Sequence, residues 1–254
     1  MIKFVGAGSG APDLITVRGM KLLQEADVII YAGSLVNPQL LEYKKEDCQV
    51  YNSAYMTLEE VLEVIQEAHR CHQMTARVHT GDPSIFGAHR EQMDRLDALG
   101  IPYEVIPGVS SFLSAAAELK REYTLPGVSQ TVILTRMEGR TGVPERESIE
   151  RLAEHRATMV VFLSVGKVRE LCRKMIPAYG KDTPAAVVYK ASWEDQRILR
   201  GTLETLPALV EASGIRKTAL TLVGEFLGDD YELSRLYDRT FTHEYRKGSG
   251  EDLA

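Results

Sequence analysis

Three short glycine-containing segments carry residues suited to binding a polar small molecule. They are residues 6–10 (Gly-Ala-Gly-Ser-Gly), residues 79–87 (His-Thr-Gly-Asp-Pro-Ser-Ile-Phe-Gly) and residues 105–111 (Val-Ile-Pro-Gly-Val-Ser-Ser). Each contains or follows a short apolar run typical of a buried strand. Glycine lets the backbone approach a ligand closely, and ligands of α/β proteins bind at the carboxyl ends of strands. The three segments together predict one binding crevice.

The second segment offers a carboxylate within a stiff turn. Gly81 permits close backbone approach, Asp82 accepts hydrogen bonds from hydroxyl or amino groups, and Pro83 stiffens the chain. Such a loop suits a polar, cationic ligand, although an ordinary Asp-Pro turn contains the same residues. In the third segment, Ser110 and Ser111 stand where a helix begins. Either hydroxyl can cap that helix or reach a ligand.

The first segment resembles the G-x-G-x-x-G fingerprint of dinucleotide-binding enzymes, with Ala11 in the third glycine position. That fingerprint also needs an Asp or Glu at the end of the second strand to hold the ribose, and Tyr31, Ala32 and Gly33 occupy this place. Pro12 removes an N–H that a pyrophosphate would use. These residues disfavour a nicotinamide enzyme.

Strand-like and helix-like patterns alternate along the chain, which indicates an α/β fold with mainly parallel sheets. The clearest helix begins at Thr57 and Glu60, which form a capping box ahead of apolar residues at helical spacing. We expect strands at residues 2–5, 27–31, 76–79, 103–106, 131–134, 159–163, 185–189, 196–201 and 219–223, and helices at 16–25, 58–68, 88–99, 110–120, 145–154, 167–175 and 206–212.

The irregular stretch 122–127, with Pro126, marks a domain boundary. We predict a first domain over residues 1–120 that carries the glycine loops. A second α/β domain covers residues 121–240. The polar residues 241–254 are predicted to be a disordered tail.

Length and charge narrow the classes of function. The chain has 254 residues, of which 44% are hydrophobic and 26% charged, so we expect a globular protein. The net charge of −6 argues against a nucleic-acid binder, which needs clustered Lys and Arg. No run approaches the roughly 18 to 20 apolar residues that cross a bilayer, and we identify no signal peptide before residues 6–10. We expect a cytoplasmic protein without nucleic-acid or membrane partners.

The cysteines suggest reduced thiols. Cys48, Cys71 and Cys172 are odd in number and lack CxxC spacing. The one metal-like cluster is His69, Cys71 and His72, at the end of a predicted helix. There the two histidines share a face and the cysteine points elsewhere. We therefore expect a solvated helix end and no metal.

Taken together, the loops resemble the tetrapyrrole methylase family, and the resemblance covers nearly the whole chain. That family has a glycine-rich first loop, a G-D-P-x-x-F-G loop and a P-G-[VIT]-[ST]-[SA] turn in this order. Ser9 stands where the family usually has proline. Further segments are similar to the members that methylate carbon 11 of precorrin-4 or cobalt-precorrin-4 on the route to cobalamin. These segments are residues 10–19, 31–36, 78–83, 130–141 and 188–193.

The resemblance implies a homodimer of two α/β domains, with S-adenosylmethionine bound in the interdomain cleft and S-adenosylhomocysteine as a product. By similarity the donor contacts Pro12, Thr80, Gly81, Asp82, Ile85, Phe86, Ser110 and Ser111. Looser matches to the second domain add Leu163, Ala186 or Ala191, Thr218, Ala219 and Leu220.

The implied tetrapyrrole acceptor carries carboxylates, which Arg and Lys bind. The cationic candidates near the loops are Arg18, Arg90, Arg136, Arg140 and Lys190, each with a solvated surface role as the alternative, and Asp13 is a further substrate-binding candidate. Asp13, Tyr31 and His79 are candidates for proton movement. A hydrogen-bonded structural role is the stronger interpretation of His79, so the general base stays unassigned.

Other functions remain open from the sequence. A related methylase would act on another ring carbon or on a modified protein side chain. A nucleotide-binding regulatory module would use the same loops without chemistry, and a nicotinamide oxidoreductase would bind NAD. Nor does the sequence say whether the acceptor contains cobalt.

Overall fold

The computed structural model describes residues 1–33 and 35–249, and the chain divides into two compact units. The first unit comprises Met1–Leu119, Val188–Ile198 and Arg216–Leu220, and the second begins at Lys120. The sequence-based division assigns the two later segments to the second domain, whereas the structure groups them with the first. The reason is long-range contact that local patterns do not encode: residues of Val188–Ile198 form hydrogen bonds with residues 9–11 and with the helix that follows the third glycine loop.

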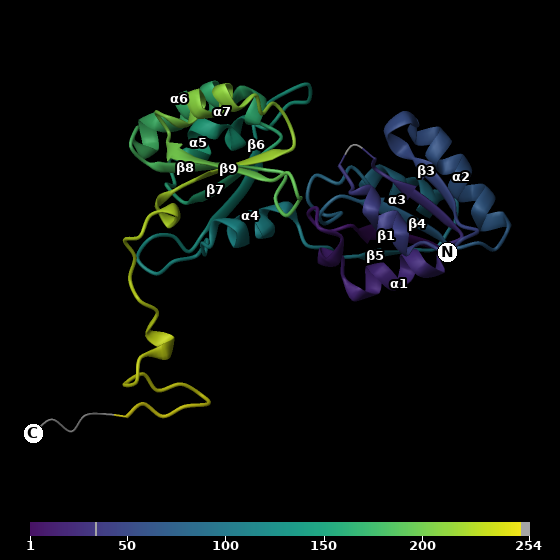
Figure 1. The fold of residues 1–254 in the computed structure, drawn as a ribbon, viewed down its shortest axis with the longest axis horizontal. Coiled ribbons are helices and arrows are strands. Elements are labelled where there is room, and N and C mark those ends of the chain that lie inside the picture. Colours follow the sequence, from purple (N-terminus) through teal and green to yellow (C-terminus); the bar gives the residue numbers. More distant parts are fainter. Residues whose placement is uncertain (34, 250–254) are drawn as a thin grey trace, which may run out of the picture. The chain divides into compact units, whose positions relative to one another are not determined.

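The first unit is built on a five-stranded sheet in the order β3-β2-β4-β1-β5, with all neighbouring strands parallel (Figure 1). Adjacent residues of a strand enter different cores, as Ile29 and Ile30 of β2 do, because the sheet is covered on both faces. Its elements are β1 Ile2–Gly6, α1 Val17–Glu25, β2 Val28–Tyr31, β3 Gln49–Asn52, α2 Leu58–Arg70, β4 Thr75–His79, α3 Arg90–Ala98, β5 Tyr103–Ile106 and α4 Ser111–Leu119.

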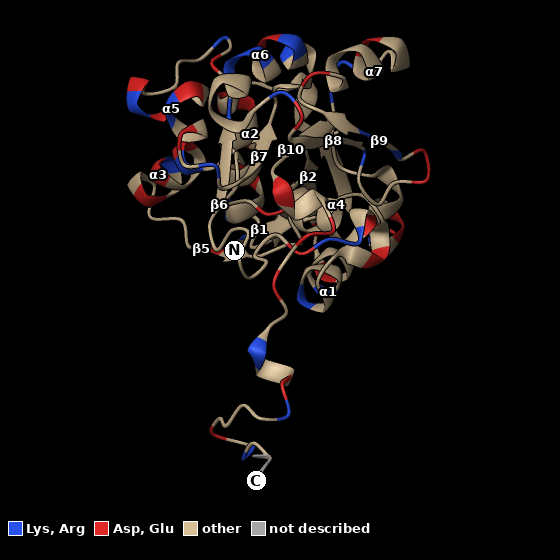
Figure 2. Ribbon diagram, turned by 90° about the vertical axis from the view of Figure 1, so that its left-hand side faces the viewer, with Lys and Arg blue, Asp and Glu red and all other residues tan. Residues whose placement is uncertain are grey.

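The second unit contains most of a mixed sheet in the order β6-β7-β10-β8-β9. β6 and β7 are parallel, and β7 and β10 are antiparallel. The strands β7, β10 and β8 carry no Lys, Arg, Asp or Glu, whereas α5 and α6 carry both signs of charge (Figure 2). Its elements are β6 Val132–Arg136, α5 Ile149–Ala153, β7 Thr158–Phe162, α6 Val168–Tyr179, β8 Pro184–Tyr189, β9 Arg197–Thr202, α7 Leu206–Ser213 and β10 Ala219–Val223.

The α/β fold is confirmed, with differences at particular elements. The capping box of Thr57 and Glu60 opens α2 as predicted. The predicted helix over residues 145–154 is instead a 3-10 turn at Glu145–Glu147 followed by the short α5. In the predicted tail, residues 241–249 include a turn in which His243 and Arg246 exchange backbone hydrogen bonds. Residues 250–254 lie outside the described residues.

Two further properties concern membrane and metal. In the described ranges 1–33 and 35–249, no helix is long and apolar enough to cross a membrane. The same residues include no group of three or more His, Cys, Asp and Glu side chains arranged to hold a metal ion.

Candidate functional site

The strand order brings the three glycine loops together. β4, β1 and β5 are neighbours in the sheet, so the loops that follow them leave the same sheet edge. Gly8 and Gly81 exchange backbone hydrogen bonds, at 3.3 Å from Gly8 N to Gly81 O and 2.8 Å from Gly81 N to Gly8 O. The first and second loops are therefore joined directly.

Glycine is required where the third loop meets the other two. A Cβ atom on Gly108 would lie 2.2 Å from the carbonyl oxygen of Gly81 and 2.8 Å from the Cα atom of Gly6. Gly81 has a φ of +61°, a conformation in which a side chain is strained, and a Cβ there would lie 3.4 Å from the Cα atom of Ser110. The predicted convergence of the three loops is thus present within the first unit.

Asp82 fastens the second loop to the third. One oxygen, Oδ2, accepts the Gly108 N–H at 2.8 Å, and the other accepts the Ser84 N–H at 2.8 Å and the Ser84 hydroxyl at 2.5 Å. Burial opposes ionisation of this carboxyl, but the bonds from Ser84 and Gly108 outweigh burial and lower its pKa. Asp82 is therefore an anion whose two oxygens both shape the loops.

His79 is a buried structural residue. Its side chain is 4% exposed, and it hydrogen-bonds to the backbone of Gly87 at the far end of the second loop. Burial, with smaller contributions from Arg77 and His89, lowers the pKa of His79 to about 3. The imidazole is neutral near pH 7 and its Nε2 atom has no partner, so the geometry supports the structural interpretation over a proton-transfer role.

A second imidazole holds the same loop. His89 hydrogen-bonds to the backbone of Pro83, and burial lowers its pKa despite the nearby Asp82. The rings of His79 and His89 lie 5.5 Å apart, and Phe4 packs against both. The second loop is thus supported by two imidazoles and a phenyl ring.

The first loop is held by a segment from much later in the chain, which the sequence did not reveal. The Ser9 hydroxyl lies 2.6 Å from that of Ser114 and 2.8 Å from that of Ser192. The Trp193 indole donates to the carbonyl of Ser9 at 3.1 Å, across 184 residues of sequence. A Cβ on Gly10 would lie 2.1 Å from the Trp193 ring. The family resemblance already included residues 188–193, but their contact with the first loop is a long-range property of the fold.

The other donor candidates are spread over both units. Thr80 donates its hydroxyl to the carbonyl of Leu35 at 3.2 Å, and Ser110 is 4% exposed. Phe86 and Leu163 have positive φ values of 52° and are 46% and 72% exposed. Pro12, Ile85 and Ser111 are half-buried, and Ala186, Ala191, Ala219 and Leu220 are buried. By contact, Ala191 and Thr218–Leu220 belong to the first unit, and Leu163 and Ala186 to the second.

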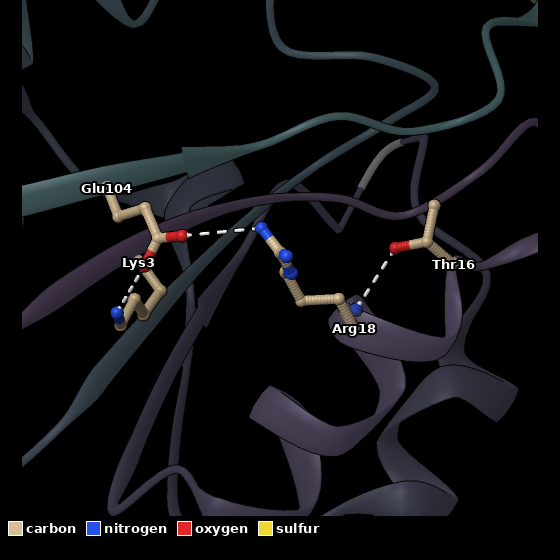
Figure 3. Close-up of polar contacts among 5 residues, drawn as sticks. Lys3, Thr16, Arg18 and Glu104 are labelled. Atoms are coloured by element: carbon tan, nitrogen blue, oxygen red, sulfur yellow. Dashed lines mark hydrogen bonds and ion pairs between the residues drawn. The ribbon is translucent and has the colours of Figure 1, made fainter.

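Arg18, Arg90 and Asp13 lie on exposed positions of the first unit. Arg18 is 71% exposed and its guanidinium lies 3.6 Å from Glu104, which also binds Lys3 (Figure 3). Arg90 pairs with Asp94 along α3 at 2.7 Å. Asp13 is exposed in the 3-10 turn Pro12–Leu14.

Arg136 has a different environment in the second unit. It donates to the carbonyls of Met137 and Thr141, both at 3.2 Å, and of Gly142 at 2.8 Å. Its guanidinium therefore shapes the loop that exposes Arg140. Lys190, in the first unit, pairs with Asp195 at 2.6 Å.

The three converging loops contain no Lys or Arg. Residues 6–11, 80–87 and 107–111 offer backbone groups, hydroxyls and the Asp82 carboxylate. A pyrophosphate would meet no cation in them, whereas a positively charged ligand would meet an anion. The Asp82 carboxylate is therefore compatible with a cationic ligand.

Comparison with known proteins agrees with the site. Residues 1–207 match the tetrapyrrole (corrin/porphyrin) methylases. The chain belongs to the tetrapyrrole methylase family. It is 54% identical to the cobalt-precorrin-4 C(11)-methyltransferase of Methanocaldococcus jannaschii over 96% of this chain and 95% of the relative. It is 48% identical to the precorrin-4 C(11)-methyltransferase of Pseudomonas aeruginosa, over 97% and 99% of the two chains.

Solved structures of tetrapyrrole methylases have the same fold. An X-ray structure of a cobalt precorrin-4 methyltransferase aligns with a TM-score of 0.88 and 45% identity, covering 90% of this chain and 96% of that one. A uroporphyrin-III C-methyltransferase from Thermus thermophilus, complexed with S-adenosylhomocysteine, aligns with a TM-score of 0.73 and 27% identity, covering 89% and 92%. The chain is thus a methyltransferase of this family, and S-adenosylmethionine is its methyl donor.

Proposed function

We propose that the chain transfers a methyl group from S-adenosylmethionine to carbon 11 of precorrin-4, or of its cobalt-containing form, in cobalamin biosynthesis. Two observations support the proposal together: the arrangement of the glycine loops and the reaction for which the relatives are named. The loops converge on one sheet edge, and relatives similar over nearly their whole length are named for this reaction. The alternative is a methylase that acts on another ring carbon with the same loops. Identification of the methylated product distinguishes the two.

We propose that the donor binds at the converging loops. The loops fit a sulfonium compound because they hold a carboxylate and no Lys or Arg. The proposed donor-binding residues are Pro12, Thr80, Gly81, Asp82, Ile85, Phe86, Ser110, Ser111, Ala191, Thr218, Ala219 and Leu220 in the first unit, and Leu163 and Ala186 in the second.

The chemistry asks mainly for alignment. Bound S-adenosylmethionine supplies an activated methyl carbon, and the nucleophile is an electron-rich ring carbon of the acceptor. The protein then has to hold the reacting atoms about 3 to 3.5 Å apart. Rigid loops serve this purpose: Asp82 and Gly108 fix the second loop against the third, and His79 holds its far end. His79 is buried and neutral, so it is not our candidate for the proton acceptor.

We propose that cations in or beside the family-like segments bind the carboxylates of the acceptor. The candidates are Arg18, Arg90, Arg136, Arg140 and Lys190, with Asp13 as a polar contact. Arg136 acts mainly through the shape of its loop, because three backbone carbonyls accept from its guanidinium. Arg140, which that loop exposes, is the candidate for direct contact.

The chain is further proposed to work in the cytoplasm as a homodimer. The thiols of Cys48, Cys71 and Cys172 are unpaired, which suits a reducing compartment. The homodimer rests on the family resemblance, and sedimentation of the purified protein tests it. A monomer at assay concentration would contradict it.

Methyl transfer to defined acceptors tests the proposed reaction. The protein is incubated with isotopically labelled S-adenosylmethionine and, separately, with precorrin-4, cobalt-precorrin-4 and precorrins of earlier and later methylation state. Mass spectrometry should detect labelled methyl only with a precorrin-4 form, and the preferred form assigns the metal-free or cobalt route. Transfer to another precorrin, with none to precorrin-4, would refute the proposal.

A further inference from the structure

The segment from Tyr189 to Arg197 gathers cations on aromatic rings. The Lys190 ammonium lies 5.0 Å from the ring centre of Trp193 and 5.5 Å from that of Tyr189. The guanidinium of Arg197 lies 4.9 Å from the centre of the Tyr189 ring. Aromatic faces attract cations electrostatically at such distances. This cluster of two cations on aromatic rings is balanced in charge by Glu194 and Asp195 of the same segment.

A carboxylate of the chain itself occupies this cluster. Asp195 Oδ2 accepts from Lys190 Nζ at 2.6 Å, and the side chains are 58% and 25% exposed, respectively. The bond to Asp195 is the main cause of the raised pKa of Lys190, so the ammonium is charged. Ion pairs as exposed as this one contribute little to stability. Another carboxylate can therefore replace Asp195 at small cost.

The backbone places Lys190 beside the first glycine loop and holds it there. Lys190 and Ser192 have positive φ values of 48° and 67°, which are strained for residues other than glycine. Such a conformation persists only where its surroundings fix it. Here the Lys190 N–H donates to the Thr218 carbonyl at 2.9 Å, and the Ser192 hydroxyl bonds to that of Ser9 at 2.8 Å. Strained backbone that long-range contacts hold in place is characteristic of functional sites.

We propose that Lys190 is a docking point for one carboxylate of the acceptor, and that Asp195 occupies this point until the acceptor displaces it. Tyr189 and Trp193 hold the ammonium in place and offer flat apolar surface beside it. The inference rests on the proposed function, because it requires an acceptor that carries carboxylates. It adds to that function a residue, Asp195, that opposes acceptor binding.

Steady-state kinetics of the full-length enzyme test the exchange. Asp195→Asn removes the competing carboxylate, so the acceptor KM is expected to fall about threefold or more while the donor KM is unchanged. Lys190→Met should raise the acceptor KM. In the Lys190→Met background, Asp195→Asn should have no further effect on the acceptor KM, because the proposed competition is for Lys190. Affinity for S-adenosylhomocysteine, measured by calorimetry, should be unchanged in Asp195→Asn and shows that the fold is intact.

A matched control separates the local pair from overall charge. Glu211→Gln makes the same change of net charge at an exposed pair with Arg169 in the second unit, where the distance is 2.6 Å. Its acceptor KM should equal that of the wild type. An equal fall in both variants, or an unchanged or raised KM in Asp195→Asn, would overturn the inference. If the wild type methylates no precorrin-4 form, the proposed function fails and the inference with it. If the wild type methylates precorrin-4 normally but the acceptor KM is unchanged in Asp195→Asn, the docking point is rejected and the proposed function stands.

Discussion

Asp82 shows how one side chain organises two loops. Its oxygens bind Gly108 on one side and Ser84 on the other, and these bonds keep its pKa low although burial opposes ionisation. Hydrogen bonds to a charged group contribute about 1.5–3 kcal/mol each. The carboxylate therefore holds the second loop against the third, and it contributes a negative charge to a site proposed for a sulfonium ligand.

Replacement of Asp82 should weaken donor binding without unfolding the protein. For Asp82→Ala, loss of the charge-assisted bonds predicts a fall in S-adenosylhomocysteine affinity of about tenfold or more. Asp82→Asn, which keeps the shape but not the charge, should have an intermediate effect. The measurement is isothermal calorimetry, with circular dichroism as a check of the fold. The control is Asp94→Ala, which breaks an exposed pair on α3. An affinity for Asp82→Ala equal to that of the control would exclude the second loop from the site.

The buried imidazole of His79 predicts a dependence of stability on pH. Its pKa is about 3 in the folded protein, against an ordinary value of 6.5. Below pH 6.5 the unfolded chain takes up a proton that the folded protein does not, so folding stability falls as the pH decreases from 6.5 towards 3. By linkage this loss amounts to about 2 kcal/mol by about pH 5.

His79→Asn isolates that contribution. The Asn amide can replace the ring N–H that bonds to Gly87, but it does not titrate. Urea unfolding of both proteins at about pH 7 and about pH 5 should show a smaller pH-dependent loss in the variant, by about 2 kcal/mol. Equal losses in the two proteins would mean that His79 is not the neutral buried group described here.

The loops depend on the close approach of three strand ends. A Cβ on Gly108 would meet the backbone of Gly81 and Gly6 within 2.8 Å, so Gly108→Ala must separate β1, β4 and β5 at their carboxyl ends. We expect a loss of about 1–3 kcal/mol in the free energy of unfolding, the usual cost of overpacking, together with weaker donor binding. Gly139→Ala is the control, because no atom lies within 4 Å of the added Cβ. Urea denaturation compares the two, and equal stabilities would contradict the described packing.

Local patterns predicted most elements of the fold. Continuous apolar strands, the Thr57 capping box and glycines after β1, β4 and β5 are properties of short segments, so they can be read from the sequence. The short edge strand β3, Gln49–Asn52, was missed because its residues are half-buried or exposed and lack an apolar run. The antiparallel pairing of β10 with β7 was not predicted. The alternation of strands and helices does not specify which strands are neighbours or in which direction each one runs.

The candidate site was predictable to the same extent. Its loops were found because they are contiguous, whereas the bond between Ser9 and Ser192 spans 183 residues. The departure from the family pattern at Ser9 had a structural meaning that only the fold reveals: its hydroxyl bonds to both Ser114 and Ser192. Arg136 was predicted to bind the acceptor because of its position in the sequence alone. In the structure its guanidinium donates hydrogen bonds to backbone carbonyls.

The chain as a whole is acidic, yet its proposed acceptor is an anion. Individual Arg and Lys side chains must therefore bind the acceptor's carboxylates. Salt screens the attraction between these charges, so acceptor binding should weaken as the salt concentration rises. Arg140→Ala should raise the acceptor KM severalfold and leave the donor KM nearly unchanged, because the side chain is proposed to touch only the acceptor. Steady-state kinetics at two salt concentrations measure both constants. Arg169→Ala, on the exposed face of α6, is the control. Equal effects of Arg140→Ala on both KM values would contradict a role in acceptor recognition.

The position of the new methyl group on the product is the most direct test of the proposed carbon-11 methyl transfer. Enzyme, precorrin-4 or cobalt-precorrin-4, and S-adenosylmethionine carrying a carbon-13 methyl group are combined, and the product is examined by carbon-13 NMR. We expect one labelled methyl, attached to carbon 11, and its loss in parallel with donor affinity in Asp82→Ala. A labelled methyl on any other ring carbon, or no transfer to either acceptor, would contradict it.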